Sequence, residues 1–149
     1  KIFDDKWMRE NGFLDEPDPL GTVGELLRRK KQRALISAKK GESVRDVIAV
    51  MRDTGFSQLP VLERDGGPLA GIVAESDLLD FLVKGEGGLE ATIDALVESD
   101  YATVSPATRI ALLRNIFNDA KMVLVESGDQ IVGVITKIDL IEYLAERRT

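Results

Sequence analysis

The chain of 149 residues contains no cysteine and no histidine. These absences exclude disulfides, thiol nucleophiles, imidazole bases and almost every structural zinc site, so we predict no metal centre. Long apolar runs are lacking as well, because none approaches the roughly 18 residues that a membrane-spanning helix needs. We therefore predict a soluble protein without a membrane partner. The lack of disulfides is compatible with a cytoplasmic location, which we predict.

Positive charge is scarce too, with 20 lysines and arginines against 26 acidic residues and a net charge of −6. Since nucleic-acid binding depends on clustered lysine and arginine, we predict no nucleic-acid partner. One locally basic run, residues 28–33, has two interpretations. It could be a solvated helix end favoured by the helix dipole, or a contact for an anionic ligand or a partner domain.

A stretch near the C-terminus occurs twice. Residues 71–82 match residues 133–144 at a constant spacing, since 133 exceeds 71 by 62 and 139 exceeds 77 by 62. In both copies a glycine and a β-branched apolar run lead into apolar residues at helical spacing. This pattern predicts a strand that passes into a helix, and internal repetition predicts a fold built from two related units.

The repetition extends to the segments before this stretch. Thr22 and Glu25 form a capping box that opens a short lead-in helix over residues 22–27. Residues 92–97 repeat its order of a threonine, an apolar residue and an apolar pair. After each lead-in helix the spacing predicts strand, helix, strand, strand, helix. These elements are expected at 34–38, 43–55, 58–62, 69–73 and 76–83 in the first copy, and at 101–104, 108–118, 121–125, 130–135 and 137–147 in the second.

We place the first repeat at residues 22–84, a glycine-rich hinge at 85–91 and the second repeat at 92–149. Residues 1–21 carry several large apolar groups and then two prolines, which predicts the end of a preceding domain and a linker. One repeat alone buries its sheet poorly. The predicted fold class is therefore α/β (α+β), with two β-α-β-β-α repeats packed through their sheets about a pseudo-twofold axis.

This order of elements, with Gly-apolar-apolar-Thr-x-x-Asp closing the repeat, resembles the tandem CBS domain, or Bateman module, over residues 22–148. Residues 1–14 are similar to the end of the catalytic domain and the linker of bacterial cystathionine β-synthases. The resemblance implies a non-catalytic regulatory region that forms homodimers. It also implies a ligand, S-adenosylmethionine or AMP/ATP, and places pyridoxal phosphate in a preceding catalytic domain.

Thr136 and Asp139 carry the binding hypothesis. A carboxylate at Asp139 can accept both ribose hydroxyls, and Thr136 lies where free backbone N–H groups can meet an anionic group. The two could instead form an N-cap pair that binds no ligand. In the first copy Asp77 could serve a weaker second site, but Ala74 lacks the hydroxyl and Ser76 could be the helix cap. We predict one competent site, at the second signature.

By resemblance, the first repeat supplies an apolar slot for the base. Phe56 is expected against the ligand, with backbone groups near Gln58 and Leu59 reading the base. Phe56 could equally be a core residue just past a helix end, and the pair after Gly133 can line the cleft and fill the core at once. The full predicted ligand site is Leu35, Ile36, Phe56, Ser57, Gln58, Leu59, Val134, Ile135, Thr136 and Asp139.

Three functions compete at this point. The first is a sensor of an adenosine derivative that shifts the packing of an attached catalytic domain. S-adenosylmethionine is favoured by the acidic signature, whereas Lys137 and the basic run 28–33 keep AMP or ATP open. The second is a structural module for dimerisation or packing, supported by Ala74. Catalysis by the chain itself is disfavoured, because no pair of carboxylates or lysines stands out as an acid and a base.

Overall fold

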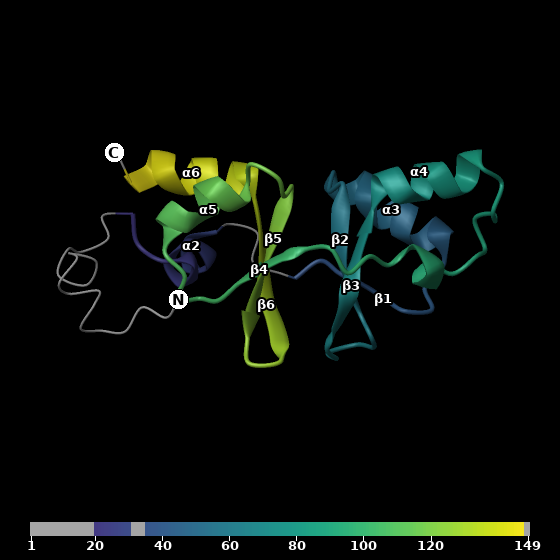
Figure 1. Cartoon of the computed structure of the whole chain (residues 1–149), viewed down its shortest axis with the longest axis horizontal. Helices are drawn as coiled ribbons and strands as arrows, with labels where there is room; N and C mark the ends of the chain where they lie inside the picture. The colour runs from purple at the N-terminus through teal and green to yellow at the C-terminus, as the bar shows by residue number, and fades with distance from the viewer. Residues whose placement is uncertain (1–19, 31–34, 148–149) are drawn as a thin grey trace.

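The computed structural model describes residues 20–30 and 35–147. This part of the chain forms two three-stranded sheets, with strand orders β1-β2-β3 and β4-β5-β6. The sheets lie next to each other in the middle of the molecule, and each carries its helices on the outer side (Figure 1). The predicted α/β class and the packing of two repeats through their sheets are confirmed.

The first repeat follows the predicted order of elements. They are α2 (Val23–Arg29), β1 (Ala38–Lys39), α3 (Val44–Thr54), β2 (Gln58–Leu62), β3 (Leu69–Ala74) and α4 (Glu75–Val83). Strand β1 is parallel to β2, and β2 is antiparallel to β3. Strand β1 is shorter than the predicted strand at 34–38 and begins at its last position; residue 34 lies outside the described part.

The helix ends of the first repeat test the cap predictions. Helix α3 begins as expected, because the Ser43 hydroxyl accepts from the Asp46 N–H at 3.1 Å. It ends at Gly55, whose φ of 78° is the left-handed conformation of a helix-ending glycine. Helix α4 differs from expectation. Ala74 occupies its N-cap position without a side-chain hydrogen bond, so Ser76 lies inside the first turn and is not the cap.

The second repeat contains η1 (Ile93–Leu96), β4 (Ala102–Val104), α5 (Ile110–Ile116), β5 (Met122–Ser127), β6 (Gln130–Thr136) and α6 (Lys137–Arg147). Its lead-in element is a single 3₁₀ turn and not a longer helix. The capping threonines explain part of this difference. The Thr22 hydroxyl accepts from the Glu25 N–H at 3.4 Å, whereas Thr92 makes no side-chain cap hydrogen bond.

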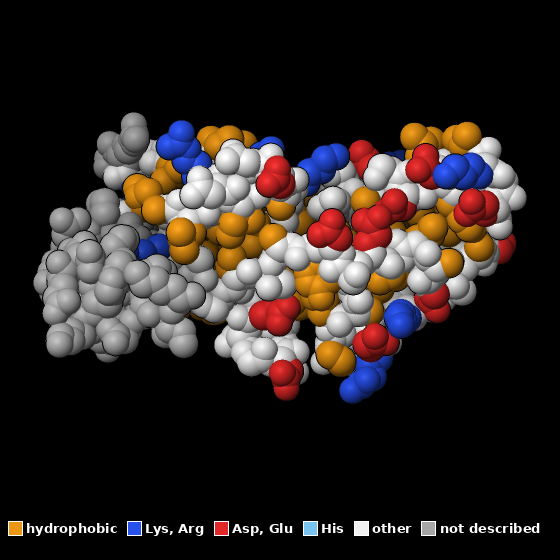
Figure 2. Space-filling view, viewed as in Figure 1, with side chains coloured by type: hydrophobic (Ala, Val, Ile, Leu, Met, Phe, Trp, Pro, Cys, Tyr) orange, Lys and Arg blue, Asp and Glu red, His pale blue; other side chains and the backbone are white. Residues whose placement is uncertain are grey.

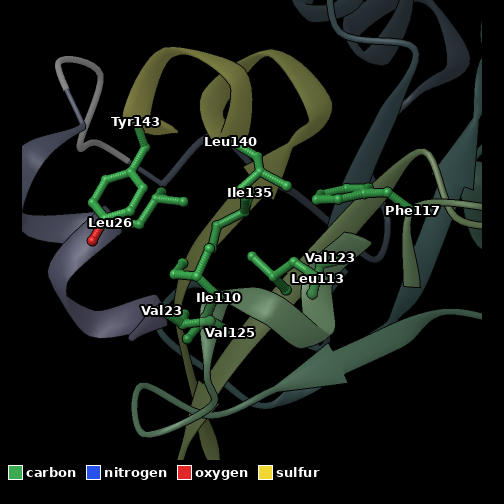
Figure 3. Packing of buried hydrophobic residues seen from close by; sticks show 10 residues of the cluster. All are labelled: Val23, Leu26, Ile110, Leu113, Phe117, Val123, Val125, Ile135, Leu140 and Tyr143. Atoms are coloured by element: carbon green, nitrogen blue, oxygen red, sulfur yellow. The ribbon is translucent and has the colours of Figure 1, made fainter. Parts of the chain in front are cut away.

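Each lead-in element packs against the other repeat. Val23 and Leu26 of α2 lie in a core with the helices and strands of the second repeat (Figure 3). Ile93 of η1 is fully buried in the core of the first repeat. Matching backbone hydrogen bonds fix the exchange, from the Val23 N–H to the Thr108 carbonyl at 2.8 Å and from the Ile93 N–H to the Glu42 carbonyl at 3.0 Å. Each core therefore depends on a segment contributed by the other repeat.

Alternating side chains of β5 pack on the two faces of the second sheet. Val123 and Val125 face the helices of the second repeat, whereas Met122 and Leu124 pack against Ile72 of the first sheet. This alternation is the ordinary two-residue period of a strand. The seam between the sheets is thus apolar at its centre, and pockets can open only toward its ends. No helix in residues 20–30 and 35–147 is long and apolar enough to cross a bilayer.

Candidate functional site

A cavity of about 620 Å³ lies on the seam between the repeats, a size suited to a nucleotide-sized ligand. The first repeat contributes the end of α2, residues 35–36 and the loop from α3 into β2. The second repeat contributes the start of β5, the end of β6 and the first turn of α6. The cavity therefore combines an apolar wall from one repeat with a strand-to-helix junction from the other.

Seven of the ten predicted ligand residues line this cavity. They are Leu35, Ile36, Phe56, Ser57, Gln58, Val134 and Thr136. The other three lie elsewhere. Leu59 and Ile135, which we expected beside the ligand, are fully buried in the two repeat cores. The reason is the strand period: Gln58 and Val134 face the cavity, so the next residue along each strand faces the helices.

Asp139 lies beside the cavity and is held there by the end of β6. Its Oδ2 accepts from the Thr136 N–H and from the Thr136 hydroxyl, both at 2.9 Å. The Asp139 N–H donates back to the Thr136 hydroxyl at 3.4 Å. This reciprocal pair is the N-cap arrangement that the sequence left open as an alternative. It coexists with a place for Thr136 on the cavity wall.

Lys30, at the C-terminal end of α2, closes the space between Asp139 and the cavity. Its ammonium lies 3.1 Å from Asp139 Oδ2 and donates to the Val134 carbonyl at 2.7 Å. Both side chains of the ion pair are only 14% exposed, so water screens the pair less than a surface salt bridge. Asp139 is thus neutralised by a residue more than one hundred positions away in the chain.

Among the described residues the wall of the cavity carries four cations, Arg28, Lys30, Lys121 and Lys137, and no acidic residue. Three of them belonged to features noted in the sequence: Arg28 and Lys30 lie in the basic run 28–33, and Lys137 was noted by itself. Lys121 was missed. Aligning the two hairpins could have located it. Ala74 and Thr136 are equivalent, and their strand partners are Gln58 and Met122. The residues just before these partners, Ser57 and Lys121, are therefore equivalent as well.

The corresponding cleft at the first signature is closed by the chain itself. Ile72, the counterpart of Val134, exchanges backbone hydrogen bonds with Glu98: the Ile72 N–H donates to the Glu98 carbonyl at 2.9 Å, and the reverse bond is 2.7 Å. Gly71 permits this approach, because a Cβ at that position would collide with the Glu98 carbonyl. The counterpart of Phe56 is Ala120, so the apolar wall is also smaller. This segment occupies the strand edge at Ile72, whereas at the matching position of the second repeat the Val134 carbonyl accepts from the Lys30 ammonium.

Asp77 lies in a separate acidic pocket of about 230 Å³ with Asp80, Glu86 and Glu98. Its Oδ2 is buried without a hydrogen-bond donor among the described groups. Two ionised carboxylates cannot donate to each other, so a hydrogen bond between Asp77 and Glu98 needs a proton on one of them. Partial desolvation, then the charge and hydrogen bonding of Asp77, raises the pKa of Glu98, and Asp100 adds to the shift. This pocket opposes an anionic ligand.

Two β-α-β-β-α repeats that exchange lead-in segments around a shared seam define a tandem repeat module with a cavity of nucleotide size between the repeats. A sequence model of the CBS domain matches residues 23–84 and 93–146. The chain therefore belongs to the CBS domain family, and the resemblance drawn from the signature is confirmed.

Sequences similar to this chain occur in proteins of different kinds. Cystathionine beta-synthase of Saccharomyces cerevisiae is 26% identical over 97% of this chain, which spans 36% of that protein. The A-adding tRNA nucleotidyltransferase of Geobacter sulfurreducens is 25% identical over 91% of this chain, which spans 15% of it. The chain thus spans less than two fifths of either protein.

Solved structures share the fold. The CBS-domain containing protein from Agrobacterium tumefaciens has a TM-score of 0.70 and 20% identity, over 83% of this chain and 92% of that one. CBSX2, solved in complex with AMP, has a TM-score of 0.70 and 18% identity over 87% of this chain and 99% of its own. CbpB, solved in complex with c-di-AMP, has a TM-score of 0.68 and 17% identity over 87% of each chain. At these identities the likeness shows the fold alone.

Proposed function

We propose that the chain is a regulatory module that binds an adenosine nucleotide in the cavity between its repeats. The observation that carries this proposal is the composition of the cavity wall. It combines apolar residues such as Ile36 and Phe56 with cations, one of them at the start of α6. A purine ring needs an apolar slot with nearby polar groups, and a phosphate needs cations and free N–H groups. The lining of the cavity contains both kinds of group.

Each part of the ligand has a candidate contact. The base would lie against Phe56, with Ser57 and Gln58 at its edge. The phosphate would approach Thr136 and Lys137, where the α6 macrodipole adds to the attraction. The Thr136 hydroxyl now donates to Asp139 and would rotate to donate to the ligand.

The ribose would lie next to Asp139. Within the described part of the chain, every hydrogen bond and ion pair of its carboxylate uses Oδ2. Because a carboxylate oxygen has two lone pairs, Oδ1 can accept from a ribose hydroxyl without breaking the helix cap. Asp139 would therefore serve as cap and as ligand contact together.

The cavity wall favours AMP or ATP over S-adenosylmethionine, against the preference drawn from the acidic signature. That preference assumed that carboxylates would surround the ligand, whereas the lining contains four cations and no carboxylate. The sulfonium of S-adenosylmethionine would meet like charge there. The AMP and c-di-AMP complexes of two structural neighbours support the choice of an adenine nucleotide.

Regulation would act through α2 and the segment before it. Tyr143 of α6 donates to the Leu20 carbonyl at 2.8 Å, which ties α6 to the chain just before α2. A ligand that binds more tightly to one packing of α2 on α6 would raise the population of that packing, and this change would be passed to a domain that precedes α2.

We propose that this domain is the pyridoxal-phosphate-dependent catalytic part of a cystathionine β-synthase, on the likeness of residues 1–14, which lie outside the described residues. A homodimer and a cytoplasmic setting remain predictions.

A structural module without a ligand is the second candidate, and one observation favours it. Helices α4 and α6 expose large apolar residues, among them Leu79 and Val83 on α4 and Ile138 and Ile141 on α6. Hydrophobic side chains are visible over both helices (Figure 2). Such a surface suits packing against another protein. The closed first cleft is also consistent with this role.

Calorimetric titration of the purified chain with AMP, ATP and S-adenosylmethionine separates the two candidates. We expect AMP or ATP to bind with Asp139→Ala abolishing the heat, because the ribose loses its acceptor. Asp77→Ala is the matched control at the corresponding position and should change the affinity little. Since Asp139 also caps α6, Phe56→Ala provides a second test that leaves the cap intact, with an expected loss of at least about tenfold.

Two results would contradict this proposal. The absence of heat with all three ligands would leave the structural module as the function. Equal losses in Asp139→Ala and Asp77→Ala would show that the open cavity is not the binding site.

A further inference from the structure

We propose that Lys30 determines the ligand class of this cavity, by filling an internal cation site so that the cavity selects phosphorylated adenosine over its sulfonium derivative. The inference rests on the proposed function and assigns a role to a residue outside the repeated signature. It depends on three observations: what Lys30 contacts, how well those contacts are shielded, and what replaces Lys30 in the other cleft.

Two acceptors converge on the Lys30 ammonium, the Asp139 carboxylate at 3.1 Å and the Val134 carbonyl at 2.7 Å. Their side of the cavity would be negative without a cation between them. A single positive group at this point satisfies both acceptors, which is the geometry of a small cation-binding site. The chain supplies that cation itself, from the end of α2.

The low solvent exposure of Lys30 strengthens the effect of its charge inside the cavity. Lys30 and Asp139 are each 14% exposed, whereas the members of the ion pair between Arg45 and Glu90 are 59% and 80% exposed. Charge–charge interactions weaken as water enters between the groups, so the partly buried pair influences a bound ligand more than a surface pair does. With Lys30 in place, a ligand meets Arg28, Lys121 and Lys137 as net positive charge.

The closed cleft shows that this cation belongs to one repeat only. There the carbonyl of Ile72, the counterpart of Val134, accepts from the Glu98 N–H at 2.7 Å. The Glu98 carboxyl lies beside Asp77, the counterpart of Asp139; Lys84 lines the same pocket but forms no ion pair with Asp77 in the described part of the chain. Lys30 therefore marks the chemical difference between the two clefts. The shared fold does not require it.

The test compares Lys30→Met with Arg28→Met in the chain of residues 1–149. Both variants remove one cation from the cavity wall and the same end of α2, but only the first exposes Asp139. Affinities for AMP and for S-adenosylmethionine are measured by calorimetry, and the preference for AMP is their ratio. We expect Lys30→Met to lower this ratio by at least about tenfold, the effect of one unshielded charge a few ångströms from the ligand.

Arg28→Met should lower the ratio less than about threefold, because its side chain is exposed and screened. Lys30→Arg, which keeps the charge, should retain the wild-type preference. If Lys30→Met does not fold, Lys30→Gln carries the same expectation, since its amide can still donate to the Val134 carbonyl. A purely structural role for Lys30 would lower both affinities together and leave the ratio unchanged.

The outcomes separate this inference from the proposed function. An unchanged ratio in Lys30→Met, with AMP still bound by the wild type, would overturn the role of Lys30 alone. An equal fall of the ratio in Lys30→Met and Arg28→Met would also overturn it, because net charge and not the Asp139 contact would then set the preference. Failure of the wild-type chain to bind either ligand would overturn the proposed function and this inference with it.

Discussion

Replacing Ala74 with threonine should give the first signature the helix cap of the second. In the second repeat the Thr136 hydroxyl donates to Asp139 Oδ2 at 2.9 Å and accepts from the Asp139 N–H at 3.4 Å. In the first repeat Ala74 occupies the same N-cap position without a side-chain hydrogen bond, and Asp77 Oδ2 is buried without a donor among the described groups. A hydroxyl at position 74 would supply both missing interactions.

The size of the effect follows from the two interactions gained. An N-cap hydroxyl contributes about 1 kcal/mol, and pairing a buried acceptor about 1–3 kcal/mol. Ala74 is 6% exposed, so two extra atoms also need space and can cost part of this gain. Ala74→Val removes that uncertainty, because valine has the shape of threonine without its hydroxyl. We expect the threonine variant to be more stable than the valine variant by about 1–2 kcal/mol.

Urea unfolding near neutral pH, followed by circular dichroism, measures the difference. The midpoints of the two variants are compared at equal slopes, so that the change reports stability and not a different unfolded state. The reverse pair, wild type and Thr136→Val, should show a difference of the same sign and similar size. Equal stabilities of the threonine and valine variants at position 74 would refute the reasoning, since the first junction would then not share the geometry of the second.

Two further predictions concern the cores and the acidic pocket. Leu26→Ala should cost about 2–4 kcal/mol and raise hydrogen exchange mainly in α6 of the second repeat, because Leu26 completes that core; faster exchange confined to the first repeat would contradict the exchange of lead-in segments. The pKa of Glu98 is raised in the folded state, so its stabilising contribution is complete below the unfolded pKa and is lost as pH rises through the folded value. Glu98→Gln should remove this loss in urea unfolding followed as a function of pH, and an unchanged pH profile would contradict the contact with Asp77.

Local patterns in the sequence predicted most of the elements. Apolar periodicity located α3 and α6, and the caps at Ser43 and Gly55 fixed the ends of α3 because cap preferences depend on a few neighbouring residues. Predictions failed where local signals were weak. Strand β1 has only two residues, and the lead-in turn of the second repeat lacks the capping hydrogen bond that Thr22 makes. Successive side chains of a strand face opposite sides, so Leu59 points away from the cavity although its neighbour Gln58 lines it.

The sequence by itself determined the two-repeat architecture and the pairing of Thr136 with Asp139, because both depend on residues close together in the chain. The contrast between Thr136 and Ala74 led to the prediction of one competent cleft, but only the tertiary structure shows the contacts that differ between the two clefts. Glu98 pairs with Ile72 in one cleft, and Lys30 meets Asp139 in the other. These contacts join segments far apart in the sequence, and the exchange of the lead-in elements brings them together, so no local pattern records them.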